Sequence, residues 1–437
     1  MPRNFPNFIT ACAGALKDSA IPEIYRVWSS ISIVAGALGR RVWYDFGAYE
    51  VRPNLYIVQI GGPGSGKSLS LILPVEKLFR KLTTEPGTKK GQEAFNADLE
   101  KYGLEKSPLY LVTDRITPEK LSKVIVQTQR ENLTLSTFAD KFIESPLTLV
   151  TSEFGTLVNR SDNYLQMFLT GIWDSPSNYT YRTKTSGEDF LKGPCMNWIA
   201  CATADQFVAH LPENARTQGL LSRIILVHYN GVPLPQSLYY PAPNYGELEV
   251  LREDLASISK ITGQFRFEDG LKKEAEKEVN EGINPEPTDP NLSEYLRRRP
   301  SHFVKVALSI SAAKSDELII TREDWEDTKR VMFAVEKQMP TALAHFGVGK
   351  AGRLAVDMQE FLEYITSTQD RYGIPIRVFK QELMRKVSNP LEVEQMVKVM
   401  EEAGLITVEG SIVIPNVKKE KRSLATRAER CYNRRVS

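Results

Sequence analysis

Continuous apolar runs separated by amphipathic segments fill the first part of this 437-residue chain. Runs of this kind are typical of strands that a parallel sheet buries on both faces. Amphipathic helices are predicted at 7–19, 22–42, 67–82 and 117–129, the third bent or shortened by Pro74. Strands that alternate with helices indicate an α/β fold with a mostly parallel sheet. The five expected strands lie within NLYIVQIG (54–61), PLYLVTDRI (108–116), PLTLVTSEFG (146–155), MNWIACATAD (196–205) and LLSRIILVHYN (220–230).

The pattern becomes helical and more acidic from 241 to 345, and a glycine-containing linker is expected at 346–353. The segment that follows predicts three helices and then a short apolar hairpin that turns at Gly410, which is the winged-helix arrangement. The last residues, 417–437, are rich in Lys and Arg and are expected to be disordered. The three predicted helices are 354–368, 377–387 and 390–404.

Composition excludes several classes of protein. The 56 Lys and Arg nearly balance the 54 Asp and Glu, so any contact with a polyanion must be local. The four cysteines have neither metal-ligand nor disulfide spacing, so we expect reduced thiols and no zinc. No run reaches the roughly 18 apolar residues that span a bilayer. We therefore expect no membrane partner and a cytoplasmic location, that of the bacterial host if the chain is phage-encoded.

The segment GGPGSGKS, residues 61–68, matches the pattern G-x-x-x-x-G-K-[ST] between a predicted strand and a predicted helix. Its glycines allow consecutive backbone N–H groups to turn toward phosphate oxygens. Lys67 is expected to reach the β- and γ-phosphates of ATP, and Ser68 to bind Mg²⁺. The expected nucleotide contacts are Gly61, Gly62, Pro63, Gly64, Ser65, Gly66, Lys67, Ser68 and Leu69.

Three further residues lie at the ends of predicted strands and suit phosphate chemistry. Glu153 follows the apolar run that begins at 146 and could polarise an attacking water. Thr203 ends the next run and could hydrogen-bond that water or the γ-phosphate. Arg223 precedes the last strand, where a permanently charged guanidinium could reach the γ-phosphate held by a neighbouring subunit. These are the candidate catalytic residues, together with Lys67.

The segment NYTYRTKTSGEDFLKG, residues 178–193, has the period-two alternation of a β-hairpin that turns at Ser186-Gly187. Arg182 and Lys184 lie on one face of it and are the candidate nucleic-acid contacts. Phosphate contacts of this kind supply grip that does not depend on base sequence. The alternative is an exposed hairpin with solvated charges.

Taken in order, these segments resemble the AAA+ ATPases of the helix-insert branch. More narrowly, the chain resembles a family of phage and mobile-element P-loop ATPases described as replicative helicases, with a fainter similarity to the minichromosome-maintenance helicases. The resemblance covers about residues 10 to 340, and residues 297–332 resemble the family's helical lid. It is carried by LGRRVWYDFGAYEVRPNLYIVQIGGPGSGKS, LVTDRITPEKL, LTLVTSEFG, WDSPSNYTYRTKTSGEDFLKGPCMNWIACATADQF and LLSRIILVHYN.

The resemblance implies a role for each matching position. Lys67 and Ser68 match the Walker A pair, Glu153 the Walker B glutamate, Thr203 sensor 1 and Arg223 the arginine finger. The second sensor of the family would be Arg299 or Lys305, near the start of the lid helix. Ser152 stands where the family has the Walker B aspartate, and a hydroxyl orders the Mg²⁺ shell less firmly than a carboxylate.

The implied layout is an N-terminal helical segment packed on an ATPase core, followed by a lid, a linker, a winged helix and a tail. The implied activity is that of a ring-forming DNA helicase, expected to be a hexamer, which hydrolyses ATP and translocates on single-stranded DNA in phage or mobile-element replication. The domain ranges are 1–50, 51–240, 241–345, 346–353, 354–416 and 417–437.

Two other functions stay open. The expected recognition helix of the winged helix has more Glu than its single Lys398, which favours a replication partner protein over DNA as its target. An ATP-dependent helicase loader or regulatory switch without unwinding activity is therefore one alternative. A P-loop enzyme that forms no ring, such as a small-molecule kinase, is the other.

Overall fold

The computed structural model describes residues 3–72, 74, 96–104, 107–113, 116–132, 142–158, 163–183, 187–211, 219–229, 231, 245–343, 358, 362, 373–386, 390–402 and 404–415. Two compact units divide the chain, Met1–Ala344 and His345–Ser437. No helix in these ranges is both long and apolar enough to cross a membrane.

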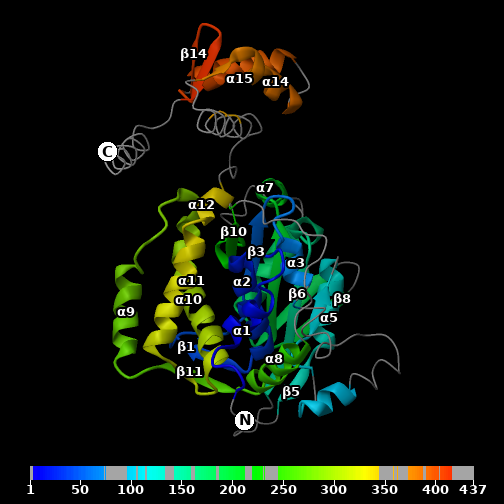
Figure 1. The fold of residues 1–437 in the computed structure, drawn as a ribbon. Coiled ribbons are helices and arrows are strands. Elements are labelled where there is room, and N and C mark those ends of the chain that lie inside the picture. The colour runs from blue at the N-terminus through cyan, green and yellow to red at the C-terminus, as the bar shows by residue number, and fades with distance from the viewer. Residues whose placement is uncertain are drawn as a thin grey trace, which may run out of the picture. The chain divides into compact units, whose positions relative to one another are not determined.

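A parallel sheet forms the centre of the first unit, so the α/β class with a parallel sheet is confirmed (Figure 1). Neighbouring strands of its main path are parallel throughout, and β5 (Arg130–Asn132) pairs antiparallel with the strand beside it. The five predicted runs all contribute a strand. Their order across the sheet is β10 (Ile224–Tyr229), β3 (Tyr56–Gly61), β9 (Pro194–Ala202), β6 (Phe142–Thr151) and β4 (Leu111–Thr113).

Helices cover both faces of this sheet. Helix α2 (Glu23–Leu38) lies against the face that carries Gln59, whose Nε2 donates to Tyr25 O at 3.2 Å. Tyr56, three residues earlier in β3, faces the opposite side, where its hydroxyl donates at 2.8 Å to the carbonyl of Leu169 in α6 (Asn163–Trp173). Strand β3 is therefore buried on both faces, which explains its continuous apolar sequence.

Several helices of this unit begin where the sequence supplies a cap. Thr117 accepts a hydrogen bond from Lys120 N and starts α5 (Pro118–Gln127). Asn7 does the same at the start of α1 (Phe8–Ala15). Thr203 caps α7 (Ala204–His210). Helix α3 is described over Lys67–Ile72, and the rest of the helix predicted at 67–82 lies outside the described residues apart from Pro74.

The predicted hairpin is present as β7 (Asn178–Thr183) and β8 (Gly187–Lys192). Gly187 has a φ of 79°, which a glycine accepts without strain. Aromatic contacts attach the hairpin to α6, because Phe168 packs 5.6 Å from the ring of Tyr179 and 4.8 Å from that of Tyr181. These contacts attach β7 of the hairpin to α6, next to the main sheet.

A second, smaller sheet joins the N-terminal segment to the region predicted to be helical. Strand β11 (Gly263–Phe267) pairs in parallel with β1 (Val42–Asp45), between β2 (Glu50–Val51) and β12 (Ile319–Ile320). The sequence prediction missed all four strands of this sheet, and the helix predicted at 22–42 ends at Leu38, before β1. The helices of this region are α8 (Tyr245–Ile258), α9 (Leu271–Glu281), α10 (Ser293–Lys314), α11 (Arg322–Glu336) and α12 (Met339–Ala342).

The second unit contains a three-stranded antiparallel sheet and two described helices. Its core includes Phe379, Leu383, Met400 and Val413, and its hairpin turns at Gly410 as predicted. The expected linker 346–353, the tail 417–437 and, apart from residues 358 and 362, the helix 354–368 lie outside the described residues. The elements are β13 (Ile374–Pro375), α14 (Ile376–Lys386), α15 (Pro390–Glu402), β14 (Ile406–Glu409) and β15 (Ile412–Pro415).

Candidate functional site

The glycine-rich segment connects the end of β3 to the start of α3. Gly64 and Gly66 have φ values of 74° and 77°, in the left-handed region that favours glycine. A Cβ atom on Gly66 would lie 2.1 Å from the carbonyl oxygen of Ala20, and one on Gly61 would lie 2.4 Å from the hydroxyl of Tyr25. The glycines therefore serve two purposes: they turn the loop, and they let the segment before α2 pack against it.

Substitutions at Gly66 and Gly64 separate these two effects. Both alanine variants pay for a left-handed backbone, which costs about 1–2 kcal/mol. Gly66→Ala also meets the Ala20 carbonyl, whereas a Cβ on Gly64 has no atom within 4 Å. We expect Gly66→Ala to lower the free energy of unfolding by at least about 1 kcal/mol more than Gly64→Ala does. Urea denaturation measures both, and equal losses would contradict the packing described here.

Lys67 and Ser68 form the first turn of α3 at the accessible end of this loop. The Lys67 Nζ donates to Gly62 O at 2.9 Å. Burial lowers the pKa of Lys67, while the carboxylate of Glu153 acts in the opposite direction. Ser68, Gly62, Pro63 and Gly64 are exposed, so the loop can be reached by a ligand.

Glu153 and Thr203 lie at the same edge of the sheet as this loop. Within the parallel register, Thr151 of β6 is level with Ala200 of β9, and Ala202 of β9 is level with Ile60 of β3. The residues that follow these strands thus meet beside the loop, as sequence reasoning expected. Glu153 and Ser152 are exposed there. Oxygen ligands are those that Mg²⁺ prefers, so Ser68 and Glu153 suit a site completed by phosphate oxygens and water.

Thr203 has a structural task besides its proposed one. Its hydroxyl oxygen accepts from Gln206 N at 3.2 Å, and the Gln206 side chain returns to the backbone N–H of Thr203, which forms a capping box. A hydroxyl that accepts one hydrogen bond can still donate its own proton. Thr203 can therefore cap α7 and donate to a phosphate or a water together.

Arg223 lies at the opposite edge of the sheet. It ends the short 3₁₀ turn Leu221–Arg223, directly before Ile224, which is level with Tyr56 at the start of β3. The loop follows the other end of β3, five residues further on, about 17 Å at the rise of a parallel strand. Within one chain, Arg223 is therefore not next to Lys67.

The Arg223 guanidinium is held by three neighbours. It donates to Gly219 O at 2.9 Å and to the Asp174 carboxylate at 3.2 Å, and it lies 5.6 Å from the centre of the Trp173 ring. Burial lowers the pKa of Arg223, and Asp174 raises it. Only 10% of its side chain is exposed, so its direction is set by these contacts.

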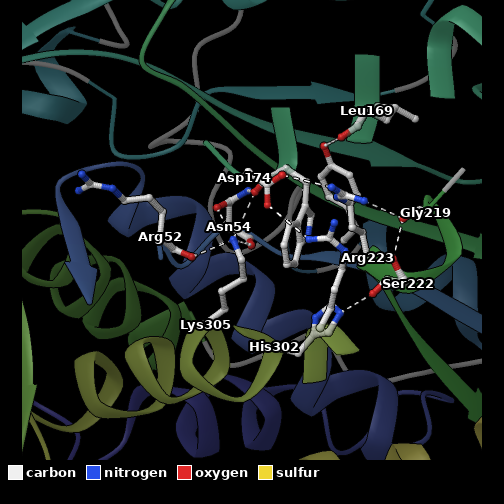
Figure 2. A network of polar contacts seen from close by, with 12 residues as sticks. Arg52, Asn54, Leu169, Asp174, Gly219, Ser222, Arg223, His302 and Lys305 are labelled. Atoms are coloured by element: carbon white, nitrogen blue, oxygen red, sulfur yellow. Dashed lines mark hydrogen bonds and ion pairs between the residues drawn. The ribbon is translucent and has the colours of Figure 1, made fainter. Parts of the chain in front are cut away.

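The two candidates for a second sensor do not join the loop. Arg299 is buried in α10, where it pairs with Glu336 of α11 at 2.7 Å and donates to Pro285 O at 2.6 Å. Lys305 is buried at the amino edge of the sheet, where its Nζ donates to the carbonyls of Arg52 and Asn54 at 3.0 and 3.1 Å (Figure 2). Both cations hold α10 in place, because a buried charge requires its partners close by. In this structure both residues bind groups of their own chain, and their contact with a nucleotide stays a prediction.

Figure 2 shows the polar network around Arg223 and Lys305. Lys305 Nζ also bonds to Asn54 Oδ1 at 2.8 Å, and His302 Nε2 lies 2.9 Å from Ser222 O. Burial lowers the pKa of Lys305 to about 7 and that of His302 to about 3. His302 is thus a neutral donor to the carbonyl through Nε2. Helix α10 is tied by these bonds to the turn that carries Arg223.

The proposed nucleic-acid residues are placed only in part. Arg182 is 71% exposed on β7 and pairs with Glu188 of β8 at 2.9 Å, directly across the hairpin. Phe190, also on the hairpin, is 59% exposed. Lys184 lies outside the described residues. The β7–β8 hairpin therefore exposes an arginine that is already paired with a carboxylate, and an aromatic ring.

Sequence reasoning missed two residues of these sites. Asp174 holds Arg223, and Tyr25 donates from α2 to Ile60 O at 2.7 Å, at the base of the loop. Tyr25 stands in no motif. Asp174 lies in a segment that carries the family resemblance, but its position at the end of an apolar helix, before Ser175-Pro176, indicates only an exposed polar turn. Comparisons with models of known protein families and with curated proteins find no match to this chain.

Proposed function

We propose that this chain is an ATPase of the P-loop AAA+ class that acts as a ring, in which each ATP lies between two copies of the chain. One observation carries the proposal: Lys67, Glu153 and Thr203 meet at one edge of the sheet, while Arg223 lies at the opposite edge. A single copy cannot bring these residues together. A head-to-tail arrangement of copies can, and such an arrangement forms a ring when the rotation between neighbouring copies closes.

The strand order supports this class of ATPase. The phosphate loop follows β3, a strand inside the sheet, with β10 on one side and β9, β6 and β4 on the other. Loops that follow the carboxyl ends of parallel strands form the usual crevice for ligands in such sheets. The arrangement supports a nucleotide site at the loop edge.

Each residue then has a defined task. The loop amides and Lys67 would hold the phosphates, Glu153 would accept a proton from the attacking water, and Thr203 would orient that water. Bound Mg²⁺ would neutralise charge on the phosphates, with Ser68 among its oxygen ligands. Arg223 of the adjacent copy would stabilise the charge that develops in the transition state. Ser152 in place of an aspartate would make turnover slower without preventing binding.

We further propose that the motor moves along single-stranded DNA, as a helicase in phage or mobile-element replication. The β7–β8 hairpin supports this use, since its exposed Arg182 can contact a phosphate and its exposed Phe190 can stack on a base. The second unit is proposed to be a winged helix that contacts a replication partner. Its antiparallel sheet and helices α14 and α15 support that proposal.

ATPase assays with and without a single-stranded oligonucleotide test this proposal. We expect the oligonucleotide to raise the turnover rate several-fold and ATP with Mg²⁺ to shift the chain from monomer to ring in light scattering. Arg182→Ala should reduce the stimulation, whereas Arg266→Ala should not. Arg266 is an exposed arginine of β11 that also pairs with a carboxylate, that of Asp269. Absence of both stimulation and assembly would contradict the proposal, and a permanently monomeric chain would favour the kinase alternative.

The second candidate is a helicase loader or regulatory switch that assembles with ATP without unwinding DNA. Two observations favour it. Arg182 already has a carboxylate partner across the hairpin. Glu394 and Glu402 of α15 pair with Lys380 and Lys398, which offsets the attraction of these lysines for phosphate and suits a protein partner. ATP-dependent assembly without strand separation would select this candidate.

A further inference from the structure

Asp174 connects two arginines from distant parts of the chain. Its Oδ2 accepts from Arg223 at 3.2 Å, and its Oδ1 lies 3.6 Å from a guanidinium nitrogen of Arg298 in α10. Both guanidinium groups lie over the ring of Trp173, with distances of 5.6 and 5.5 Å to its centre. One carboxylate and one indole ring thus gather two permanent positive charges at the amino edge of the sheet.

Donors exceed acceptors in this cluster. Among the residues that the structure describes, the buried Arg223 Nε and Trp173 Nε1 have no hydrogen-bond acceptor. Unsatisfied buried donors are uncommon in native proteins and point to a missing ligand or water. The two guanidinium charges likewise exceed the single charge of Asp174. The cluster therefore has two buried donors without an acceptor and more positive than negative charge.

The same cluster is reachable from solvent. The side chain of Asp174 is 54% exposed and that of Arg298 is 34% exposed, while Arg223 is buried behind them at 10%. Asp174 is the outermost group of the three by these values. An anion that approaches this edge would meet Asp174 first and could take its place on both arginines.

We propose that Asp174 holds the place of a phosphate group: the Arg223–Asp174–Arg298 cluster is a latent polyphosphate site, and a nucleoside triphosphate bound to the loop of a second copy displaces the carboxylate. This inference rests on the proposed function, because the triphosphate is presented by the adjacent chain. A terminal phosphate offers three oxygens and more charge than a carboxylate, and arginine binds it through two parallel hydrogen bonds. Asp174 is a positioning residue, since it acts on the arginines and does not touch the nucleotide.

The exchange gives the cluster two states. In the separate chain, Asp174 neutralises part of the charge and keeps both guanidinium groups stacked on Trp173. Next to a loaded neighbour, the phosphate replaces Asp174, and the released carboxylate turns to solvent. Assembly would thus depend on whether the neighbour carries a triphosphate or a diphosphate.

Binding of inorganic tripolyphosphate, measured by calorimetry in a Lys67→Ala background, tests the inference without hydrolysis or assembly. We expect Asp174→Asn, and equally Asp174→Ser, to raise the affinity at this edge about tenfold, with a steep dependence on salt. The gain should vanish when Arg223→Ala and Arg298→Ala are added. The matched control is Asp316→Asn, an aspartate of 52% exposure that pairs with Arg3 at 2.5 Å.

The outcomes separate the two proposals. An unchanged affinity in both Asp174 variants, a similar gain in Asp316→Asn, or a gain that persists without both arginines would overturn the latent site and leave the ATPase proposal standing. If the wild-type chain does not hydrolyse ATP but the Asp174 variants still bind tripolyphosphate about tenfold more tightly, the ATPase proposal is overturned and the anion site is kept.

Discussion

Replacement of Lys67 by alanine is expected to weaken ATP binding by at least about 100-fold and to remove measurable hydrolysis. Lys67 begins α3 beside the exposed loop, and its Nζ bonds to Gly62 O, a position from which it can turn to a phosphate. Without the ammonium, two or more phosphate charges would lose their nearest cation. Fluorescent nucleotide titration and steady-state phosphate release measure the two effects.

Glu153→Gln is the matched control for this variant. It keeps the loop, Lys67 and a side-chain oxygen at position 153 that can face Mg²⁺, but the amide cannot accept the proton of the attacking water. We therefore expect ATP to bind with nearly normal affinity while turnover falls about 100-fold or more. The wild-type melting temperature should be kept by both variants, because both residues are at least partly exposed. Normal ATP binding by Lys67→Ala would show that the glycine-rich loop is not a nucleotide site.

Much of the central sheet was predictable because a strand that is buried on both faces requires a continuous apolar run in the local sequence. A strand such as β3 or β9 is buried at each of its positions, and a continuous apolar run is the result. The start of α5 at Thr117 was predictable for a related reason, since an N-cap and a following proline act within one turn. The β7–β8 hairpin was visible from alternation and a Gly turn. These signals need no knowledge of distant parts of the chain.

Contacts between residues far apart in the chain could not be predicted from the local sequence in this way. Strand β11 joins β1 across more than two hundred residues, and the alternation of GQFRF is too short to be separated from the helices around it. The family pattern suggested that Arg299 or Lys305 would meet the nucleotide. The sequence position of a residue on a helix does not show whether its side chain faces the interior. In this structure Arg299 binds Glu336 and Lys305 binds the Asn54 carbonyl inside the unit. The role of Asp174 appears only once α6, α10 and the Arg223 turn lie together.

Arg223→Ala is expected to lower ATP turnover about 1,000-fold while the affinity for ATP changes little. Arg223 lies at the sheet edge opposite Lys67, so its contribution must come from a neighbouring copy. Loss of its contacts with Trp173 and Gly219 could also disturb the local turn. A measurement is therefore needed that separates a displaced turn from a missing cation.

Mixing two inactive variants supplies that measurement. Each interface of the ring combines the loop of one copy with Arg223 of the next copy. In a mixed ring, an interface is complete when an Arg223→Ala copy supplies the loop, with its Lys67 intact, and a Lys67→Ala copy supplies the intact Arg223. Random mixing in equal amounts makes about one quarter of the interfaces complete. We expect phosphate release to recover to about that fraction of the wild-type rate, with no recovery when either variant is mixed with itself. A mixture as inactive as its components would show that Arg223 acts within its own chain or not at all, and the shared-site ATPase would have to be abandoned.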